Sequence, residues 1–133
     1  MIGSRYIQEG HLKKRQPFYR ILGARFLNFM VRLMVGLKIK DTQCGFKLFS
    51  EKSAIDIFHR LTFKRFSFDV EVLSIANFLG YNIKEVPVDW YARGEGTVSP
   101  IRDGLRFLKA LIIIRMNLWR KLYRNISRKS QEV

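Results

Sequence analysis

Two long stretches of this chain contain many basic residues and no acidic one. The first lies between Glu9 and Asp41, and the second lies between Asp103 and Glu132. Both stretches are also rich in apolar residues, so two basic, apolar segments flank a central segment of more balanced charge. With a net charge of +14, this pattern indicates a partner that carries negative charge: nucleic acid, an anionic lipid surface or a phosphorylated substrate.

The length and composition predict one folding unit, or part of one. A chain of 133 residues with 47% hydrophobic residues can bury one modest core. The single cysteine, Cys44, excludes an intramolecular disulfide and favours a reducing compartment. The first residues do not follow the pattern of a signal peptide, and charged residues interrupt the longest apolar runs before they reach the length of a membrane span.

The hydrophobic periodicity predicts an alternation of strands and helices. Strands are expected at 1–6 and 83–91, a loop leading into a strand at 41–49, and helices at 17–37, 51–61, 68–79 and 101–124. Ser50 can cap the second of these helices, and Gly80 can end the third in a left-handed conformation. Pro87 lacks a backbone N–H, which favours an edge position for its strand. The order of elements predicts an α/β fold.

The basic segments are expected to form amphipathic helices. In the first helix, one apolar face is formed by Phe18, Leu22, Phe26, Phe29, Leu33 and Leu37. In the last helix, an apolar stripe is formed by Ile101, Leu105, Leu108, Ile112, Met116, Trp119 and Tyr123. Beside it lies a basic stripe of Arg102, Arg106, Lys109, Arg120 and Arg124. Such a helix fits a lipid interface, and it equally fits a terminal helix that packs on the protein's own core with its bases in water.

Five short strings of residues occur in a specific order along the chain. They are Gly-Ser-Arg at 3–5, Asp-Thr-Gln-Cys-Gly-Phe-Lys-Leu-Phe at 41–49, Arg-Phe-Ser-Phe-Asp-Val-Glu-Val-Leu at 65–73, Glu-Val-Pro-Val-Asp-Trp at 85–90 and Pro-Ile-Arg-Asp at 100–103. In this order and at these separations the chain resembles the C-terminal half of the dolichyl-phosphate glucosyltransferases, which are family 2 glycosyltransferases. The resemblance covers the chain from residue 3 to about residue 115.

The resemblance implies the C-terminal part of a GT-A fold, an α/β Rossmann-like sheet that is incomplete here and carries amphipathic interfacial helices. Residues 1–100 would form the acceptor-side part of the catalytic domain, and residues 101–133 a basic membrane-interface helix and tail. The implied reaction is an inverting transfer of glucose or a related hexose from a UDP-sugar to dolichyl or another polyprenyl phosphate. Such an acceptor is an ionised phosphate monoester, which needs cationic positioning more than a strong general base.

This chemistry selects a set of candidate site residues: Asp41 and Gln43 as catalytic residues, and Arg5, Arg20, Lys47 and Glu71 as phosphate- or substrate-binding residues. Asp41 matches the acidic residue that opens a family motif near the reacting sugar, although composition alone favours a loop aspartate that caps a turn. Arginine and lysine can neutralise the acceptor phosphate and the departing diphosphate. Glu71 matches an acidic helix position and is expected to face the acceptor or to pair with Arg5.

The chain departs from the family pattern in three respects. Lys47 stands where many relatives have arginine, which removes bidentate phosphate binding but keeps the charge. The loop at 94–99 lacks the lysine that relatives often carry. The family's nucleotide-binding strands and its DxD metal motif precede the Gly-Ser-Arg string, and no DxD occurs in this sequence. A divalent cation, Mg²⁺ or Mn²⁺, is therefore expected for a full-length family enzyme, with no metal ligands in this chain, and the isolated chain is expected to be inactive.

The isolated histidines and two acidic positions carry little further signal. His11 and His59 have no cysteine or carboxylate at ligand spacing, so they do not indicate a metal site. Asp69 and Glu71 fall at the start of a predicted helix, where carboxylates stabilise the helix dipole. Two alternative functions remain at this point: a basic nucleic-acid-binding module and a non-enzymatic membrane-surface protein.

The resemblance also implies partners and a location. The expected partners are a UDP-sugar donor, a dolichyl or polyprenyl phosphate acceptor and an anionic membrane surface, with no nucleic acid. The expected location is the cytoplasmic face of a membrane: that of the endoplasmic reticulum in a eukaryote, or the plasma membrane in a prokaryote.

Overall fold

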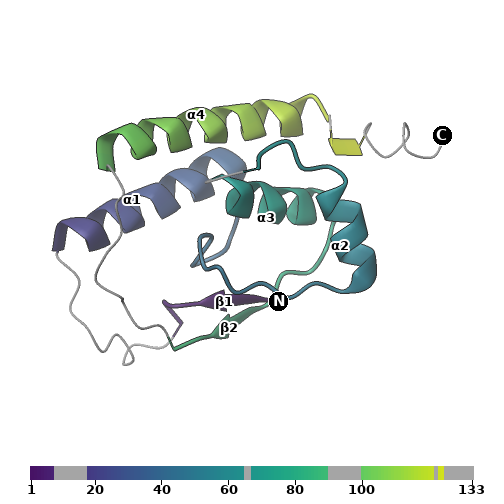
Figure 1. The fold of residues 1–133 in the computed structure, drawn as a ribbon, viewed down its shortest axis with the longest axis horizontal. Coiled ribbons are helices and arrows are strands. Elements are labelled where there is room, and N and C mark those ends of the chain that lie inside the picture. Colours follow the sequence, from purple (N-terminus) through teal and green to yellow (C-terminus); the bar gives the residue numbers. More distant parts are fainter. Residues whose placement is uncertain (8–17, 65–66, 90–99, 122, 125–133) are drawn as a thin grey trace.

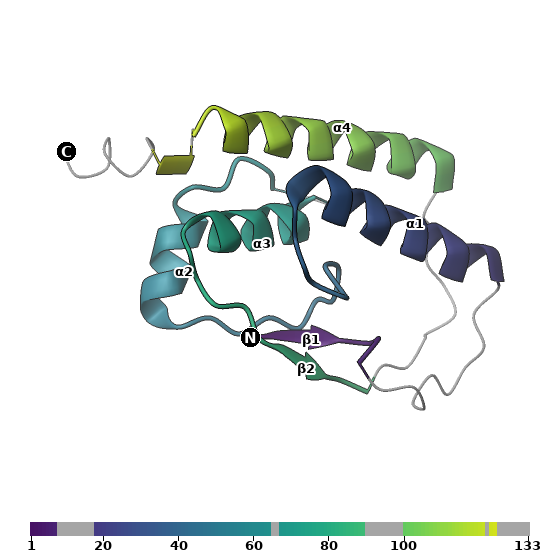
Figure 2. The same ribbon diagram turned by 180° about the vertical axis from the view of Figure 1, so that it is seen from behind.

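The computed structural model describes residues 1–7, 18–64, 67–89, 100–121 and 123–124. Its elements in chain order are β1 (Ile2–Ser4), α1 (Phe18–Val35), α2 (Glu51–Phe58), α3 (Phe68–Phe78), β2 (Glu85–Pro87) and α4 (Pro100–Trp119). The two long helices, α1 and α4, run side by side in the same direction along one side of the molecule (Figures 1 and 2). The small sheet lies on the opposite side, with α3 between (Figure 1). The mixed arrangement of helices and strands agrees with the predicted α/β class.

The sheet is centred on β1. Strands β1 and β2 are parallel and pair Ile2 with Glu85, Gly3 with Val86 and Ser4 with Pro87. Along the other edge of β1, the Gly3 N–H donates to the Phe46 carbonyl at 2.8 Å, and the only ladder contact there in the described residues is the antiparallel bridge between Ile2 and Lys47. Pro87 therefore ends a strand whose one described neighbour is β1, which agrees with its predicted edge position.

The loop predicted at the start of 41–49 is confirmed, and the strand predicted to follow it is wrong. Of its residues, only Lys47 pairs with the sheet, through the antiparallel bridge to Ile2 with its backbone bonds at Phe46 and Leu48. Side chains bind the backbone of the first residues: Glu85 accepts from the Lys40 and Asp41 N–H groups, and Asp41 accepts from the Gln43 N–H. Bonds from side chains to the backbone compete with ladder bonds, so the first part of the segment folds as a loop.

The predicted helix ends are confirmed where their chemistry is local. The Ser50 hydroxyl accepts from the Ser53 N–H at 3.3 Å and caps α2. Gly80 has a φ of 80° directly after α3, and the following Tyr81 N–H donates back to the Ala76 carbonyl at 2.9 Å. This is the left-handed ending expected from the glycine.

Two apolar clusters hold the elements together. The larger one joins β1, α1, α3 and α4, and its buried members are Ile2, Val31, Val35, Leu37, Ile39, Val70, Leu73, Phe107, Leu111 and Ile114. The smaller one joins α2 and α3 to the chain beyond α4, and its buried members are Ile57, Val72, Ile75, Ala76 and Tyr123. Because α4 contributes Phe107, Leu111 and Ile114, it shares the core of the residues that precede it.

The apolar stripes predicted from the sequence point away from this core. On α1 the exposed residues are Phe18, Leu22, Phe26, Phe29 and Leu33, which we call the α1 stripe. On α4 they are Ile101, Leu105, Ile112, Met116 and Trp119, which we call the α4 stripe. Thus α4 packs on the core through a different face. Three predicted members differ, since Leu108 is partly buried, Leu37 is buried in the larger cluster and Tyr123 is fully buried in the smaller one. None of the helices in the described ranges is long and apolar enough to cross a bilayer.

Candidate acceptor-phosphate site

A bidentate ion pair between Arg5 and Asp41 forms the centre of the candidate site. Arg5 directly follows β1, and its Nε and Nη2 donate to the two carboxylate oxygens of Asp41 at 2.7 and 2.9 Å. The Arg5 backbone N–H also donates to the Asp41 carboxylate, at 3.1 Å. Only 2% of the Asp41 side chain and 22% of the Arg5 side chain are exposed. This geometry fixes the plane of the guanidinium at the carboxyl end of β1.

The pair remains ionised at neutral pH. Burial by itself raises the pKa of the Asp41 carboxyl, but the hydrogen bonds from Arg5 and Gln43 outweigh burial, and the pKa lies below its ordinary value. The hydrogen bond to Asp41 in turn raises the pKa of Arg5. Because the folded pKa of Asp41 is lowered, the pair's contribution to stability is complete above the ordinary carboxyl pKa. That contribution is lost as the pH falls through the lowered pKa.

Two neighbouring side chains hold the loop that carries Asp41. Glu85, on β2, accepts from the Lys40 and Asp41 N–H groups at 2.9 and 3.1 Å. Asn28, on α1, donates to the Lys40 carbonyl and accepts from the Thr42 hydroxyl. Neither Glu85 nor Asn28 was among the site residues predicted from the sequence. Glu85 is the first residue of the string at 85–90, and this position could have indicated that its side chain does more than form a strand.

Replacing Glu85 tests this support. Glu85→Leu should lower the free energy of unfolding by about 1 to 3 kcal/mol, because it leaves two backbone N–H groups of the Asp41 loop without their acceptor. Glu85→Gln retains one acceptor oxygen and should lose less than half as much. Urea denaturation followed by circular dichroism measures both values. Equal losses in the two variants would show that the side chain acts by packing and not by accepting these bonds.

Gln43 and Lys47 lie close to the pair in the chain but differ in their surroundings. Gln43 is half-buried, and its backbone N–H donates to Asp41 Oδ1 at 3.3 Å. Lys47 is nearly buried, and its Nζ contacts an Asp69 oxygen at 2.6 Å and the Cys44 carbonyl. Asp69, which the sequence placed only at a helix start, is thus the counter-ion of Lys47. The phosphate role of Lys47 stays a prediction.

The structure does not bring Arg20 and Glu71 to the Arg5–Asp41 pair. Arg20 is exposed in the first turn of α1, and none of the described contacts joins it to the pair. Glu71 is fully buried, and its carboxyl accepts from the Thr62 and Phe63 N–H groups. The alternative prediction of an ion pair between Glu71 and Arg5 is therefore wrong, because Asp41 holds Arg5 and Glu71 ties the chain before α3 to the interior.

Glu71 also anchors the chain that follows α4. The Tyr123 hydroxyl donates to Glu71 at 2.9 Å, and Arg60 Nε donates to the Tyr123 carbonyl at 2.7 Å. Burial raises the pKa of the Tyr123 phenol, so it remains a hydrogen-bond donor at neutral pH. These bonds explain why Tyr123 is buried in the core and is not part of the exposed stripe predicted from the sequence.

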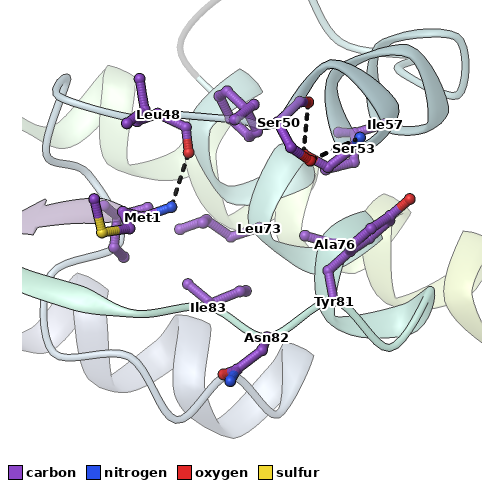
Figure 3. Close-up of a pocket in the computed structure, with 12 residues that line it drawn as sticks. Met1, Leu48, Ser50, Ser53, Ile57, Leu73, Ala76, Tyr81, Asn82 and Ile83 are labelled. Atoms are coloured by element: carbon purple, nitrogen blue, oxygen red, sulfur yellow. Dashed lines mark hydrogen bonds between the residues drawn. The ribbon is translucent and has the colours of Figure 1, made fainter.

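The residues present do not fit a divalent cation. Within the described part of the chain, no group of three or more histidine, cysteine, aspartate or glutamate side chains could hold a metal ion. A pocket of about 230 Å³ lies at the other end of β1 from Arg5, where Met1, Leu73, Ala76 and Ile83 converge (Figure 3). Its lining side chains are uncharged, in contrast to the Arg5 end of β1.

Comparison with known proteins gives consistent relatives. The dolichyl-phosphate beta-glucosyltransferase of Dictyostelium discoideum is 32% identical over 123 residues, which are 89% of this chain and 38% of that protein. The human protein of the same name is 35% identical over 114 residues, 86% of this chain and 35% of its own length. The Saccharomyces cerevisiae protein of that name is 38% identical over 87 residues, 65% of this chain and 26% of its own length. No family model and no solved structure matches the chain.

These similarities cover the chain far better than they cover the relatives. The chain spans little more than a third of the length of the curated relatives it matches. The glucosyltransferase activity in the relatives' names belongs to proteins that are nearly three times as long as the part matched here.

Proposed function

We propose that this chain, a relative of the dolichyl-phosphate beta-glucosyltransferases over most of its own length, forms the acceptor side of a glycosyltransferase. The enzyme would be an inverting family 2 enzyme with a GT-A fold. It would transfer glucose or a related hexose from a UDP-sugar to dolichyl or another polyprenyl phosphate. The observation that carries this proposal is the buried Arg5–Asp41 pair at the carboxyl end of β1.

The reaction needs charge control more than proton transfer. A phosphate oxygen of the acceptor attacks the anomeric carbon, a new carbon–oxygen bond forms, and the bond to UDP breaks with its electron pair on the diphosphate. The attacking oxygen is already ionised, so no base has to remove a proton from it. The lowered pKa makes Asp41 a poor base, which supports a positioning role for it. Asp41 orients the guanidinium of Arg5, and a guanidinium can neutralise phosphate charge as the bond to UDP breaks.

The lipid acceptor also motivates a location at a membrane. A polyprenyl phosphate keeps its tail in the bilayer, so its phosphate has to be met at the headgroup level. The exposed α4 stripe with its neighbouring basic residues supports such a position. We place the enzyme at the cytoplasmic face of the membrane as part of this proposal.

A hybrid enzyme tests the proposal. In the human relative, the matched residues would be replaced by those of this chain, and transfer of labelled glucose from UDP-glucose to dolichyl phosphate would be measured. We expect transfer by the hybrid enzyme and none by a human protein from which the matched residues are deleted. A hybrid that folds and binds UDP-glucose but transfers no sugar to any polyprenyl phosphate would refute the proposal.

The chain by itself should not transfer sugar. It spans little more than a third of its relatives, and its described residues do not form a cation site. The same assay with the isolated chain, with Mg²⁺ or Mn²⁺ present, should therefore give no product. Robust metal-dependent turnover by the isolated chain would mean that it binds the donor as well, and would overturn its assignment to the acceptor side.

A further inference from the structure

One side chain on α1 binds the chain on both sides of Asp41. The amide nitrogen of Asn28 donates to the Lys40 carbonyl, and the amide oxygen of Asn28 accepts from the Thr42 hydroxyl at 3.2 Å. These two partners are the residues directly before and directly after Asp41. A single amide group therefore spans the residue whose carboxylate holds the Arg5 guanidinium.

The residue type at position 28 suits both bonds. An asparagine side chain carries N–H donors and a carbonyl acceptor in one plane, whereas aspartate offers acceptors only and alanine offers neither. Thr42 is 1% exposed, so its hydroxyl needs a partner inside the protein, and Asn28 provides one. Asn28 itself is half-buried at the side of α1 that faces this loop.

The loop at 40–42 is held by side chains from two different elements. It belongs to no helix or strand. Glu85 on β2 accepts from its N–H groups at Lys40 and Asp41, and Asn28 binds it from α1. Figure 2 shows the chain beyond α1 turning back from that helix toward the small sheet. A shift of α1 relative to β2 would therefore move the loop and the carboxylate that it carries.

Helix α1 is otherwise joined to the molecule by apolar packing. Its buried residues are Val31 and Val35, both in its second half, and the α1 stripe is exposed. In the described part of the chain, the side-chain hydrogen bonds from α1 to another segment all come from Asn28. Packed helices can slide by small amounts, whereas a hydrogen bond tolerates only a narrow range of distance and angle. Asn28 is thus the contact that sets the position of the Asp41 loop relative to α1.

We infer that Asn28 is a positioning residue for sugar transfer, because it fixes the backbone on both sides of Asp41 and so keeps the carboxylate aligned with the Arg5 guanidinium. Its described hydrogen bonds go to Lys40 and Thr42, so it acts through the loop. The inference rests on the proposed function, since it assigns Asn28 to the same site. Its first test measures the placement of Asp41 without any sugar transfer, so the two can fail separately.

That test is a carbon NMR titration of the Asp41 carboxyl in the full chain. In the unchanged chain, hydrogen bonds from Arg5 and Gln43 keep the pKa of Asp41 below its ordinary value. Asn28→Ala should raise this pKa toward the ordinary value, because the released loop would hold those bonds less well. An unchanged pKa in an Asn28→Ala chain that circular dichroism shows to be folded would overturn the inference.

The matched control for the titration is Asn117→Ala. Asn117 is also a half-buried asparagine on a long helix, α4, but its amide donates to the Tyr123 hydroxyl at 3.4 Å. The control should leave the pKa of Asp41 unchanged. If Asn117→Ala raised that pKa as much as Asn28→Ala does, the shift would reflect a general loosening of the fold and the inference would fail.

The hybrid enzyme measures the effect on the reaction. Asn28→Ala should slow sugar transfer by about tenfold and leave the affinity for UDP-glucose within about twofold. Thr42→Val, which lacks the hydroxyl, should slow transfer several-fold, and Thr42→Ser, which keeps it, should lose less. The Asn28→Ala, Thr42→Val double variant should be no slower than Asn28→Ala alone, since that variant already lacks the bond to Thr42.

Two outcomes in the hybrid enzyme would overturn the inference. One is an unchanged transfer rate in folded Asn28→Ala. The other is a double variant slowed by the full product of the two single effects, which would mean that Asn28 and Thr42 act separately. A hybrid that made no product before any substitution would refute the proposed function, and the titration would still decide whether Asn28 positions Asp41.

Discussion

Asp41→Asn in the hybrid enzyme should reduce sugar transfer by about 100-fold, while the affinity for UDP-glucose stays within about threefold. The two oxygens of the Asp41 carboxylate each accept one N–H of the Arg5 guanidinium. Asparagine offers one oxygen and no charge, so the guanidinium would lose its fixed plane and its counter-ion. A small displacement of a cation that neutralises a reacting phosphate is enough for a loss of this size. Steady-state rates and a separate nucleotide-binding measurement give the two quantities.

The chain offers a matched control for this variant. Asp56 also lies beside an arginine, Arg60, at 3.9 Å, but on α2 and away from the Arg5 end of β1. Asp56→Asn should leave transfer nearly unchanged. If Asp41→Asn weakened UDP-glucose binding as strongly as it slowed transfer, Asp41 would belong to the donor side. If both variants slowed transfer equally, the loss would reflect general stability.

Glu71→Ala should lower the free energy of unfolding by about 3 kcal/mol or more. The carboxyl of this fully buried residue accepts from the Thr62 and Phe63 N–H groups and from the Tyr123 hydroxyl. Alanine would leave these buried donors without an acceptor, and each unsatisfied donor costs about 1 to 3 kcal/mol. Urea denaturation monitored by circular dichroism measures the change.

Glu51→Ala is the control for this effect. Glu51 is exposed in the first turn of α2, where its loss should cost about 0.5 kcal/mol through the helix dipole. A small effect of Glu71→Ala, comparable to that of Glu51→Ala, would contradict the role of Glu71 as the anchor of the interior. The sequence analysis assigned Glu71 to the substrate, so this experiment also separates the two roles.

Features that depend on neighbours in the sequence could be predicted from it. The cap at Ser50 and the helix end at Gly80 were predicted correctly, because a hydroxyl and a missing side chain act on the adjacent backbone. The order of helices and strands followed from the same kind of local periodicity. Asp41 and Arg5 were both selected as site residues, but their mutual bond joins positions 36 residues apart and required the fold.

Features that depend on distant partners were not predicted. Glu71 matched an acidic position of the family, yet its partners at Thr62 and Tyr123 appear only once α3 and the chain after α4 are folded together. The loop at the start of 41–49 was predicted, but not that Glu85, on another element, accepts from the Lys40 and Asp41 N–H groups. Periodicity identified the apolar sides of α1 and α4 but could not show that both are exposed. The same pattern fits a side that packs on the core and a side that faces away from it.

The buried tyrosine beyond the last helix determines how much of the chain the fold requires. A polypeptide ending at Trp119 would keep helices α1 to α4 and still lose the phenol that fills the smaller cluster. It would also leave Arg60 Nε without the Tyr123 carbonyl and Glu71 without one of its donors. The packed core therefore extends further along the chain than α4 does. Shortened versions of this protein should retain Tyr123 and not end at Trp119.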